Sequence, residues 1–288
     1  MKNFVEEEKI SPTFDNSTCE NYFTKILQEK NPSRPFTRPD WMPPYPTPPT
    51  SFPPNLTLCF RDICRIVGSM KARSSPCPLD GISIIAFKRC PILVSHLTRL
   101  LSACWERKFF PKIWRRALVT LIFKAGDPSE PKNFRPIALQ PVIGKIFNSF
   151  VRNKISNFLT ANDLIDTSMQ KGFWPGINGV TEHLGLLTHL MKLQKNKKRD
   201  IYVTLLDLKN AFGEVHHSLI RFSLKHHHLP DEVIDLIMMQ YTDFHLSVSA
   251  SGSSLATGPI HVQRGVLQGD TLSPLLFNIV FDSLMLTL

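Results

Sequence analysis

The chain has 288 residues, 42% of them hydrophobic, so it can bury the core of one large domain or two modest ones. It carries 34 Lys and Arg against 24 Asp and Glu, a net charge of +10, which favours a polyanionic partner, nucleic acid before an anionic membrane surface. The N-terminus is acidic, unlike a secretory signal, and the longest apolar run is interrupted by Asn278 and Asp282. The sequence thus argues against a secreted or membrane-anchored protein, and we expect an intracellular one, in the nucleus or cytoplasm.

The first 55 residues show little periodicity, and the run 41–54 is dense in proline. Proline fixes φ and removes a backbone donor, so this run predicts an extended linker. We therefore expect segment 1–55 to be disordered. The six cysteines lie between Cys19 and Cys104 without the close pairs of a zinc site, and we expect reduced thiols.

Apolar residues at helical spacing predict a series of helices beyond this segment. These helices are expected within 56–73 and over 92–105, 143–159, 181–194, 215–229 and 231–241. The helix 143–159 has a cationic side, and the helix 181–194 is expected to turn Leu184, Leu187, Leu190 and Met191 inward.

Two hairpins are predicted between these helices. The strand 117–123 is followed by a basic, turn-rich loop and a second extended segment from 133, and the hairpin tip presents Lys124, Lys132 and Arg135. Such a tip could hold phosphate oxygens, or it could be a solvated basic loop. A second hairpin is expected from 247–252 and 259–263.

The stretch 201–218 carries the most informative carboxylate. Its β-branched and apolar residues predict a strand over 201–206 that delivers Asp207 to its end, followed by a polar turn at 210–213. A carboxylate at the end of a buried strand needs a cation or a donor, and a metal ion would serve. The alternative is an aspartate that only caps a helix or turn.

A second informative stretch covers residues 264–277. The tight turn Gln268-Gly269-Asp270 precedes Ser273-Pro274, which predicts a helix start with a capping hydroxyl. A glycine beside a glutamine lets the backbone approach a flat ligand, and the helix N-terminus adds partial positive charge. This pattern suits a nucleotide.

Five motifs occur in order: SSPCPLDGI, LIFKAGDPSEPKNFRPIAL, QKGFWPGINGV, LLDLKNAFGEV and GVLQGDTLSPLLFNIV. Together they resemble the reverse transcriptase domain of non-long-terminal-repeat (LINE-like) retrotransposons, from about Pro76 to the C-terminus. Group II intron reverse transcriptases share the general pattern, but the motifs around Lys124 and Gln268 are closer to the LINE-like group.

The resemblance implies an RNA-directed DNA polymerase that uses two Mg²⁺ ions, deoxynucleoside triphosphates, an RNA template and a DNA primer. Asp207 would be the first catalytic carboxylate and would bind Mg²⁺ with the carbonyl of Leu208. The amides of Asn210 and Ala211 would approach the triphosphate. Phe212 would lie beneath the sugar and disfavour a 2′-hydroxyl.

The resemblance assigns the remaining roles to the hairpin and to the second stretch. Lys124 and Arg135 would neutralise the triphosphate, and Gln268 with Gly269 would line the nucleotide and template site. Two metals and cationic side chains are what in-line phosphoryl transfer requires.

The fold implied is α+β, helix-rich with small antiparallel sheets, comprising reverse transcriptase fingers and a partial palm. The corresponding domains are a disordered, proline-rich segment at 1–55, a helical N-terminal extension at 56–116, fingers at 117–200 and a partial palm at 201–288.

Two departures from the family pattern qualify the activity. Gly213 stands where an aspartate is common, and the aromatic-Ala-Asp-Asp motif with the other catalytic carboxylates is not found before Leu288. Asp282 lies in a helical apolar run and is not expected to replace them. We therefore expect a truncated reverse transcriptase that is inactive alone. The alternatives are a non-catalytic nucleic-acid-binding remnant, with strongly salt-dependent affinity, and a transposon relic without function.

Overall fold

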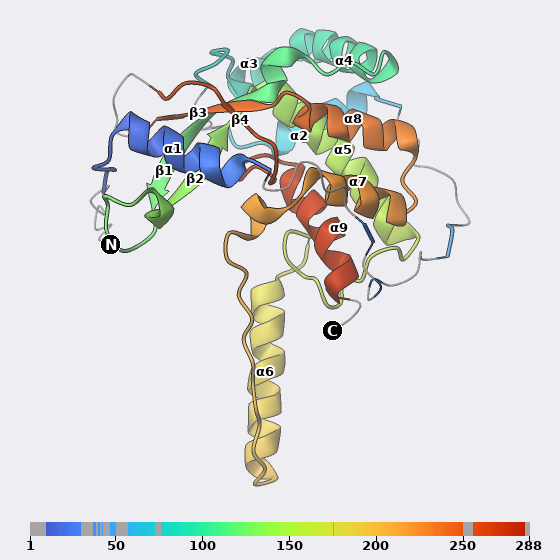
Figure 1. The fold of residues 1–288 in the computed structure, drawn as a ribbon. Helices are drawn as coiled ribbons and strands as arrows, with labels where there is room; N and C mark the ends of the chain where they lie inside the picture. The colour runs from blue at the N-terminus through green and yellow to red at the C-terminus, as the bar shows by residue number, and fades with distance from the viewer. Residues whose placement is uncertain are drawn as a thin grey trace, which may run out of the picture.

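The computed structural model contains a small sheet beside a larger body of helices, with one long helix extending away from both (Figure 1). It describes residues 10–29, 37–38, 40, 42, 47–49, 57–72, 76–174, 176–249 and 256–285. Much of the proline-rich run therefore lies outside the described residues. Among those described, no helix has both the length and the apolar content needed to cross a bilayer.

The sheet has the strand order β2-β1-β3-β4. Its strands are β1 (Arg116–Phe123), β2 (Phe134–Leu139), β3 (His245–Ser249) and β4 (Ile260–His261). The two predicted hairpins are confirmed as the antiparallel pairs β1–β2 and β3–β4. In addition β1 pairs with β3 in parallel, because the chain returns to the sheet only after several intervening helices.

A helix that the sequence analysis did not predict covers this sheet. Helix α1 (Asn16–Leu27) begins where the Asp15 side chain accepts a hydrogen bond from the Thr18 amide. It buries Cys19, Phe23 and Leu27 in the core cluster of the sheet. The expectation of disorder was therefore wrong for residues 16–27, because apolar residues spaced four apart give this polar segment one buried face.

The helical body confirms most of the predicted helices. It consists of α2 (Phe60–Ser69), α3 (Ile84–Arg89), α4 (Pro91–Glu106), α5 (Val142–Ala161), α7 (His217–His226), α8 (Asp231–Tyr241) and α9 (Ser273–Met285), with short 3₁₀ turns at η1 (Lys112–Arg115), η2 (Pro131–Asn133) and η3 (Ala211–Glu214). All six cysteines lie in described residues and are free thiols, three of them buried.

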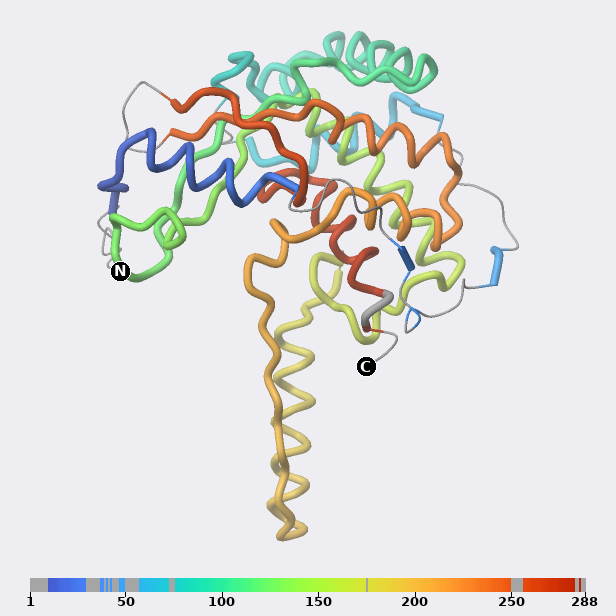
Figure 2. The backbone as a smooth tube through the Cα atoms, in the orientation of Figure 1, coloured from blue at the N-terminus to red at the C-terminus, as the bar shows by residue number. Residues whose placement is uncertain are grey.

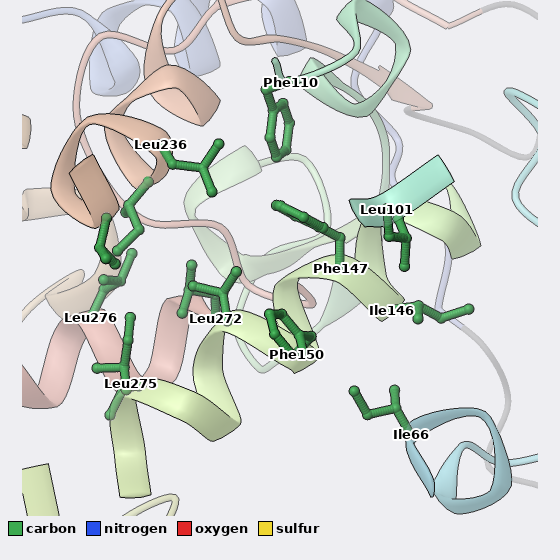
Figure 3. Close-up of a cluster of buried hydrophobic side chains, with 14 of the residues drawn as sticks. Ile66, Leu101, Phe110, Ile146, Phe147, Phe150, Leu236, Leu272, Leu275 and Leu276 are labelled. Atoms are coloured by element: carbon green, nitrogen blue, oxygen red, sulfur yellow. The ribbon is translucent and has the colours of Figure 1, made fainter. Parts of the chain in front are cut away.

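Helix α5 lies at the centre of this body. Figure 3 shows Phe147 and Phe150 among side chains of neighbouring segments, including Leu236 of α8 and Leu272 just before α9. The ring of Phe147 lies 5.6 Å from that of Trp114, just before β1. This packing fixes α5 relative to both the sheet and α9.

Helix α6 (Gly179–Asn196) projects from the body, and the following chain runs back beside it (Figures 1 and 2). We call residues 179–210 the arm. The prediction that Leu184, Leu187, Leu190 and Met191 face inward was wrong, because none of the residues of α6 is buried and of these four only Leu187 is even half-buried. The periodic leucines were identified correctly as one face of a helix, but that face contacts no core within the described residues.

The predicted strand 201–206 is also absent. Residues 201–208 are described without strand pairing, and Leu205 and Leu206 are 88% and 79% exposed. The alternation of apolar residues is typical of a strand, but a strand also needs a neighbouring backbone, and none of the described residues provides one.

Candidate nucleotide site

The hairpin β1–β2 carries the two predicted phosphate-binding cations. Ile122 of β1 pairs with Arg135 of β2, and the Lys124 amide donates to the Asn133 carbonyl at 2.9 Å just beyond the end of β1. Burial lowers the pKa of Lys124, and the nearby positive charge of Arg135 lowers it further. Two cations that repel each other on one hairpin would gain from a shared anion such as a polyphosphate.

The Gln268–Gly269 turn lies directly against β2. The Ala138 amide donates to the Gln268 carbonyl at 2.7 Å, three residues beyond Arg135 in the same strand. Gly269 has φ of +106°, and a Cβ atom at this position would lie 2.6 Å from the Ala138 carbonyl oxygen. Only glycine allows this approach, and the turn and β2 therefore form one surface.

The same segment also contacts the central turn. The Val266 amide donates to the Phe212 carbonyl at 2.8 Å, and the Gly265 amide donates to the Val215 carbonyl at 2.7 Å. A Cβ atom at Gly265 would lie 3.0 Å from the Gly213 Cα atom. Residues 264–268 therefore join the central turn to β2, and we call β1, β2, η3 and residues 264–273 the motif block.

An ion pair reinforces the junction between these two segments. The guanidinium of Arg264 is 2% exposed and makes bidentate contacts of 3.0 and 3.1 Å with the Glu214 carboxylate. Its Nε donates to the Ile26 carbonyl at 3.0 Å, so α1 takes part as well. Sequence analysis missed both residues, because nothing in a single sequence pairs positions fifty residues apart.

The central turn places Gly213 against the side chain of Asn210. Asn210 adopts a left-handed conformation with φ of +53°, and the Gly213 amide donates to its carbonyl at 2.9 Å. A Cβ atom at Gly213 would contact the side-chain nitrogen of Asn210, so the aspartate of the common pattern would require that side chain to move. Glu214 supplies a carboxylate one residue later.

Phe212 lies in a row of aromatic rings. Its ring centroid is 4.9 Å from that of Phe277 in α9 and 6.0 Å from that of Phe173. Phe212 is half-buried and follows Ala211 in η3. The packing holds its ring in place, which a residue that excludes a 2′-hydroxyl would require.

Asp207 and Leu208 lie apart from these contacts, on the exposed arm. Among the described residues there is no group of three or more His, Cys, Asp or Glu side chains placed to hold a metal ion. Mg²⁺ is usually bound by one or two carboxylates together with substrate phosphates and water. Asp207 fits one side of such a site, but the described residues do not complete a two-metal site.

Asp282 pairs with a histidine in the core and, as expected, does not lie beside Asp207. Its buried carboxylate lies 3.1 Å from Nε2 of His227, whose Nδ1 hydrogen-bonds to the Ser223 carbonyl at 2.7 Å. The pair joins α9 to the residue that follows α7 and keeps Asp282 buried in the core, whereas Asp207 is exposed.

The start of α9 differs in one detail from the expected cap. The carboxylate of Asp270 accepts hydrogen bonds from the amides of Leu272 and Ser273. The Ser273 hydroxyl, predicted to be the cap, contacts Asp270 and accepts from the Leu267 amide instead. Asp270 takes the capping role because an ionised carboxylate is the stronger acceptor.

Comparison with protein families decides the identity. Residues 122–288, more than half of the chain, match the family "Reverse transcriptase (RNA-dependent DNA polymerase)". The chain belongs to the reverse transcriptase family. The matched range contains the hairpin cations, the central turn and the Gln268–Gly269 turn.

The relatives of this reverse transcriptase chain are retrotransposon proteins, which confirms the resemblance to the LINE-like group. The chain is 32% identical over 175 residues to the Pol polyprotein of the type-1 retrotransposable element R2 of Nasonia vitripennis, covering 61% of the chain and 16% of the relative. It is 27% identical over 216 residues to that of the type-2 element R2DM of Drosophila melanogaster, covering 75% and 19%.

A third relative is the RNA-directed DNA polymerase of the mobile element jockey of Drosophila melanogaster. It is 28% identical over 192 residues, which cover 65% of this reverse transcriptase chain and 20% of the relative. The matched region thus spans about a fifth of the length of these relatives. Most of the length of each relative therefore has no counterpart in the matched region.

Proposed function

We propose that the motif block is the nucleotide-binding part of an RNA-directed DNA polymerase. It would bind a deoxynucleoside triphosphate opposite an RNA template at the end of a DNA primer. The observation that carries the proposal is the junction at residues 264–268, which hydrogen-bonds to both β2 and the central turn. Three motifs far apart in sequence are thereby joined by backbone hydrogen bonds, which supports their acting together on one substrate.

Within this arrangement we propose the residue roles that the family resemblance implies. Lys124 and Arg135 neutralise the triphosphate, the amides of Asn210 and Ala211 face it, and Phe212 restricts the sugar. Gln268 and Gly269 line the nucleotide and template side, where the absence of a side chain lets a flat base approach the backbone.

Asp207 would supply the first carboxylate for Mg²⁺, assisted by the Leu208 carbonyl. When bound, the metal ions would neutralise the phosphate charge and activate the primer hydroxyl. Since the described residues give Asp207 no carboxylate partner, we propose that the 288-residue chain alone does not extend a primer.

Nucleotide binding by the purified chain tests the proposal. The affinity for a deoxynucleoside triphosphate with Mg²⁺ should fall about tenfold in Lys124→Ala and in Arg135→Ala, because each removes a charge-assisted contact. Lys132→Ala on the same hairpin is the matched control, since Lys132 is exposed and lies 3.5 Å from Glu130. Equal losses of affinity in all three variants would mean that the nucleotide is attracted only by the general positive charge of the hairpin and not by a specific site.

Sugar discrimination tests the role of Phe212. Wild-type protein should bind dATP more tightly than ATP, and Phe212→Ala should bring the two affinities together because the ring no longer excludes the 2′-hydroxyl. An unchanged ratio would remove Phe212 from the proposed site.

A second candidate function is nucleic-acid binding without chemistry. The exposed position of Asp207, which the described residues do not build into a metal site, favours it, as does the net charge of +10. It predicts RNA or DNA affinity that falls steeply with salt and does not depend on Mg²⁺. Primer extension by the purified chain would exclude a function limited to nucleic-acid binding.

A further inference from the structure

A buried carboxylate lies directly behind the Gln268–Gly269 turn. Asp270 is 7% exposed, and its Oδ2 accepts from the amides of Leu272 and Ser273 and from the Ser273 hydroxyl, at 2.9 to 3.1 Å. Its Oδ1 accepts from Nδ2 of Asn148 at 2.7 Å. The first three contacts are local to the start of α9, and the fourth comes from another helix.

Asn148 of α5 is 2% exposed and uses both amide hydrogens. Nδ2 donates to Asp270 and, at 3.1 Å, to Oε1 of Gln240 in α8. Within the described part of the chain, Oδ1 of Asn148 and Nε2 of Gln240 have no hydrogen-bond partner. A buried polar atom without a partner costs about 1–3 kcal/mol, so packing alone would favour an apolar residue here.

The contacts of Asp270 close a ring around the turn. The Leu267 amide donates to the Ser273 hydroxyl, which contacts Asp270, and the Thr271 hydroxyl donates to the Lys145 carbonyl at 3.2 Å. Lys145 and Asn148 are neighbours on one side of α5. Gly269 is the exposed residue of the turn and lies against β2, while Asp270 behind it is buried.

We propose that Asn148 is a positioning residue that, by holding Asp270, fixes the Gln268–Gly269 turn against β2 and so sets the nucleotide-facing surface. This inference rests on the proposed function for its nucleotide readout but not for its structural readout. It assigns the placement of a surface turn to a buried side chain of α5.

The test exchanges the donor and the acceptor of the hydrogen bond between Asn148 and Asp270. Asn148→Asp places two carboxylates together, Asn148→Ala removes the donor without adding charge, and the double variant Asn148→Asp with Asp270→Asn restores one donor and one acceptor. In the double variant the amide introduced at position 270 keeps a carbonyl oxygen that can still accept from the start of α9. Gln240 can rotate its amide and donate to the carboxylate introduced at position 148. Asn157→Asp, on the exposed side of α5, is the matched control.

Two measurements are made on the full 288-residue chain. Hydrogen exchange of the Ala138 amide reports the hydrogen bond to Gln268 without any ligand, and titration with dATP and Mg²⁺ reports the nucleotide surface. Both single substitutions at Asn148 should speed Ala138 exchange and weaken dATP binding about tenfold, the ratio that one net hydrogen bond to a charged group gives. The double variant should recover most of both losses, and the control should change neither.

The outcomes separate the two proposals. If Ala138 exchange responds as expected but no form of the protein binds dATP, the proposed function fails and the positioning role stands. If either folded Asn148 variant keeps wild-type Ala138 exchange, the positioning role is overturned. If Asn148→Asp does not fold, Asn148→Ala and the double variant still test the positioning role. A double variant that is no more stable than Asn148→Asp would also overturn that role.

Discussion

The motif block and the arm carry sequence motifs of similar strength but differ completely in their surroundings. In the motif block, Gln268 and Phe212 accept backbone hydrogen bonds from segments far apart in sequence, and Gly269 lies against Ala138 of β2. In the arm, Asp207 follows a run of apolar residues that remain in solvent, among them Leu205 and Tyr202. The comparison shows that a motif identifies a function, whereas only its contacts make it a rigid site.

The difference also separates two contributions to a polymerase site. The motif block holds the groups proposed to recognise a nucleotide, and contacts among the described residues fix their positions. The arm holds the group expected to bind metal, and the described residues give it no such support. Nucleotide binding and metal binding should therefore respond differently to mutation.

The largest difference in unfolding free energy is expected between substitutions at two glycines. Gly269→Ala should lower the free energy of unfolding by roughly 2–4 kcal/mol, because the new Cβ atom meets the Ala138 carbonyl and the backbone conformation favours glycine. Gly185→Ala in α6 meets nothing within 4 Å and should favour the helix by up to about 1 kcal/mol. Urea denaturation of both variants measures the contrast, and similar losses would contradict it.

Two glutamates give the next contrast. Glu214→Ala leaves the Arg264 guanidinium buried without its carboxylate, and we expect a loss of about 3 kcal/mol in unfolding free energy. Glu182→Ala removes an exposed ion pair with Lys171 at the base of the arm and should cost less than about 1 kcal/mol. Thermal and urea denaturation would show this difference, and a Glu214→Ala effect below about 1 kcal/mol would argue against a tight junction.

The contact between α7 and the motif block should also be sensitive to acid. Burial lowers the pKa of His217 to about 4, and its Nε2 lies 3.0 Å from the Gly265 carbonyl. Because the unfolded state has the higher pKa, near 6.5, stability is complete above that pH and falls as pH decreases toward 4. Between pH 7 and pH 5 the expected loss is about 2 kcal/mol from this residue.

The variant His217→Phe isolates that contribution, since it keeps a ring beside Tyr241, whose centroid lies 4.6 Å away. Burial lowers the pKa of His226 to about 4 as well, so the variant should reduce the pH dependence without abolishing it. Urea denaturation at pH 7 and pH 5 measures this. An unchanged pH dependence would mean that His217 titrates normally.

The smallest effect is expected in the arm. Leu206→Ser changes a side chain that is 79% exposed and should alter the unfolding free energy by no more than about 0.5 kcal/mol. A large loss of unfolding free energy, measured by urea denaturation, would show that the arm packs against the body in solution. The difference between the motif block and the arm would then no longer hold.

Local sequence patterns predicted most helices and both hairpins, because apolar spacing and turn residues act over short distances. The helix 231–241 and the strand 117–123 were placed within a residue of their observed bounds. Helix α1 was missed because its apolar residues are few and lie ahead of the proline-rich run. The strand 201–206 was predicted from alternation alone, which cannot supply a neighbouring strand.

The candidate site shows the same division. Family resemblance selected Gln268, Gly269 and Phe212, and the structure brings these into one block, while their proposed roles remain to be tested. Asn148 and Arg264 were not selected, because each acts through a partner that is distant in sequence. Each is one polar side chain among others nearby in the sequence, so no local signal distinguishes it.

The parallel pairing of β1 with β3 also has a consequence for synthesis on the ribosome. Strand β1 and helix α1 emerge early, but their partners in β3, β4 and at Arg264 are translated more than a hundred residues later. Until then helix α1 and one edge of β1 lack their contacts with β3 and β4, and chains at this stage are prone to aggregation. The nascent chain should therefore depend on chaperones until residue 264 has left the exit tunnel.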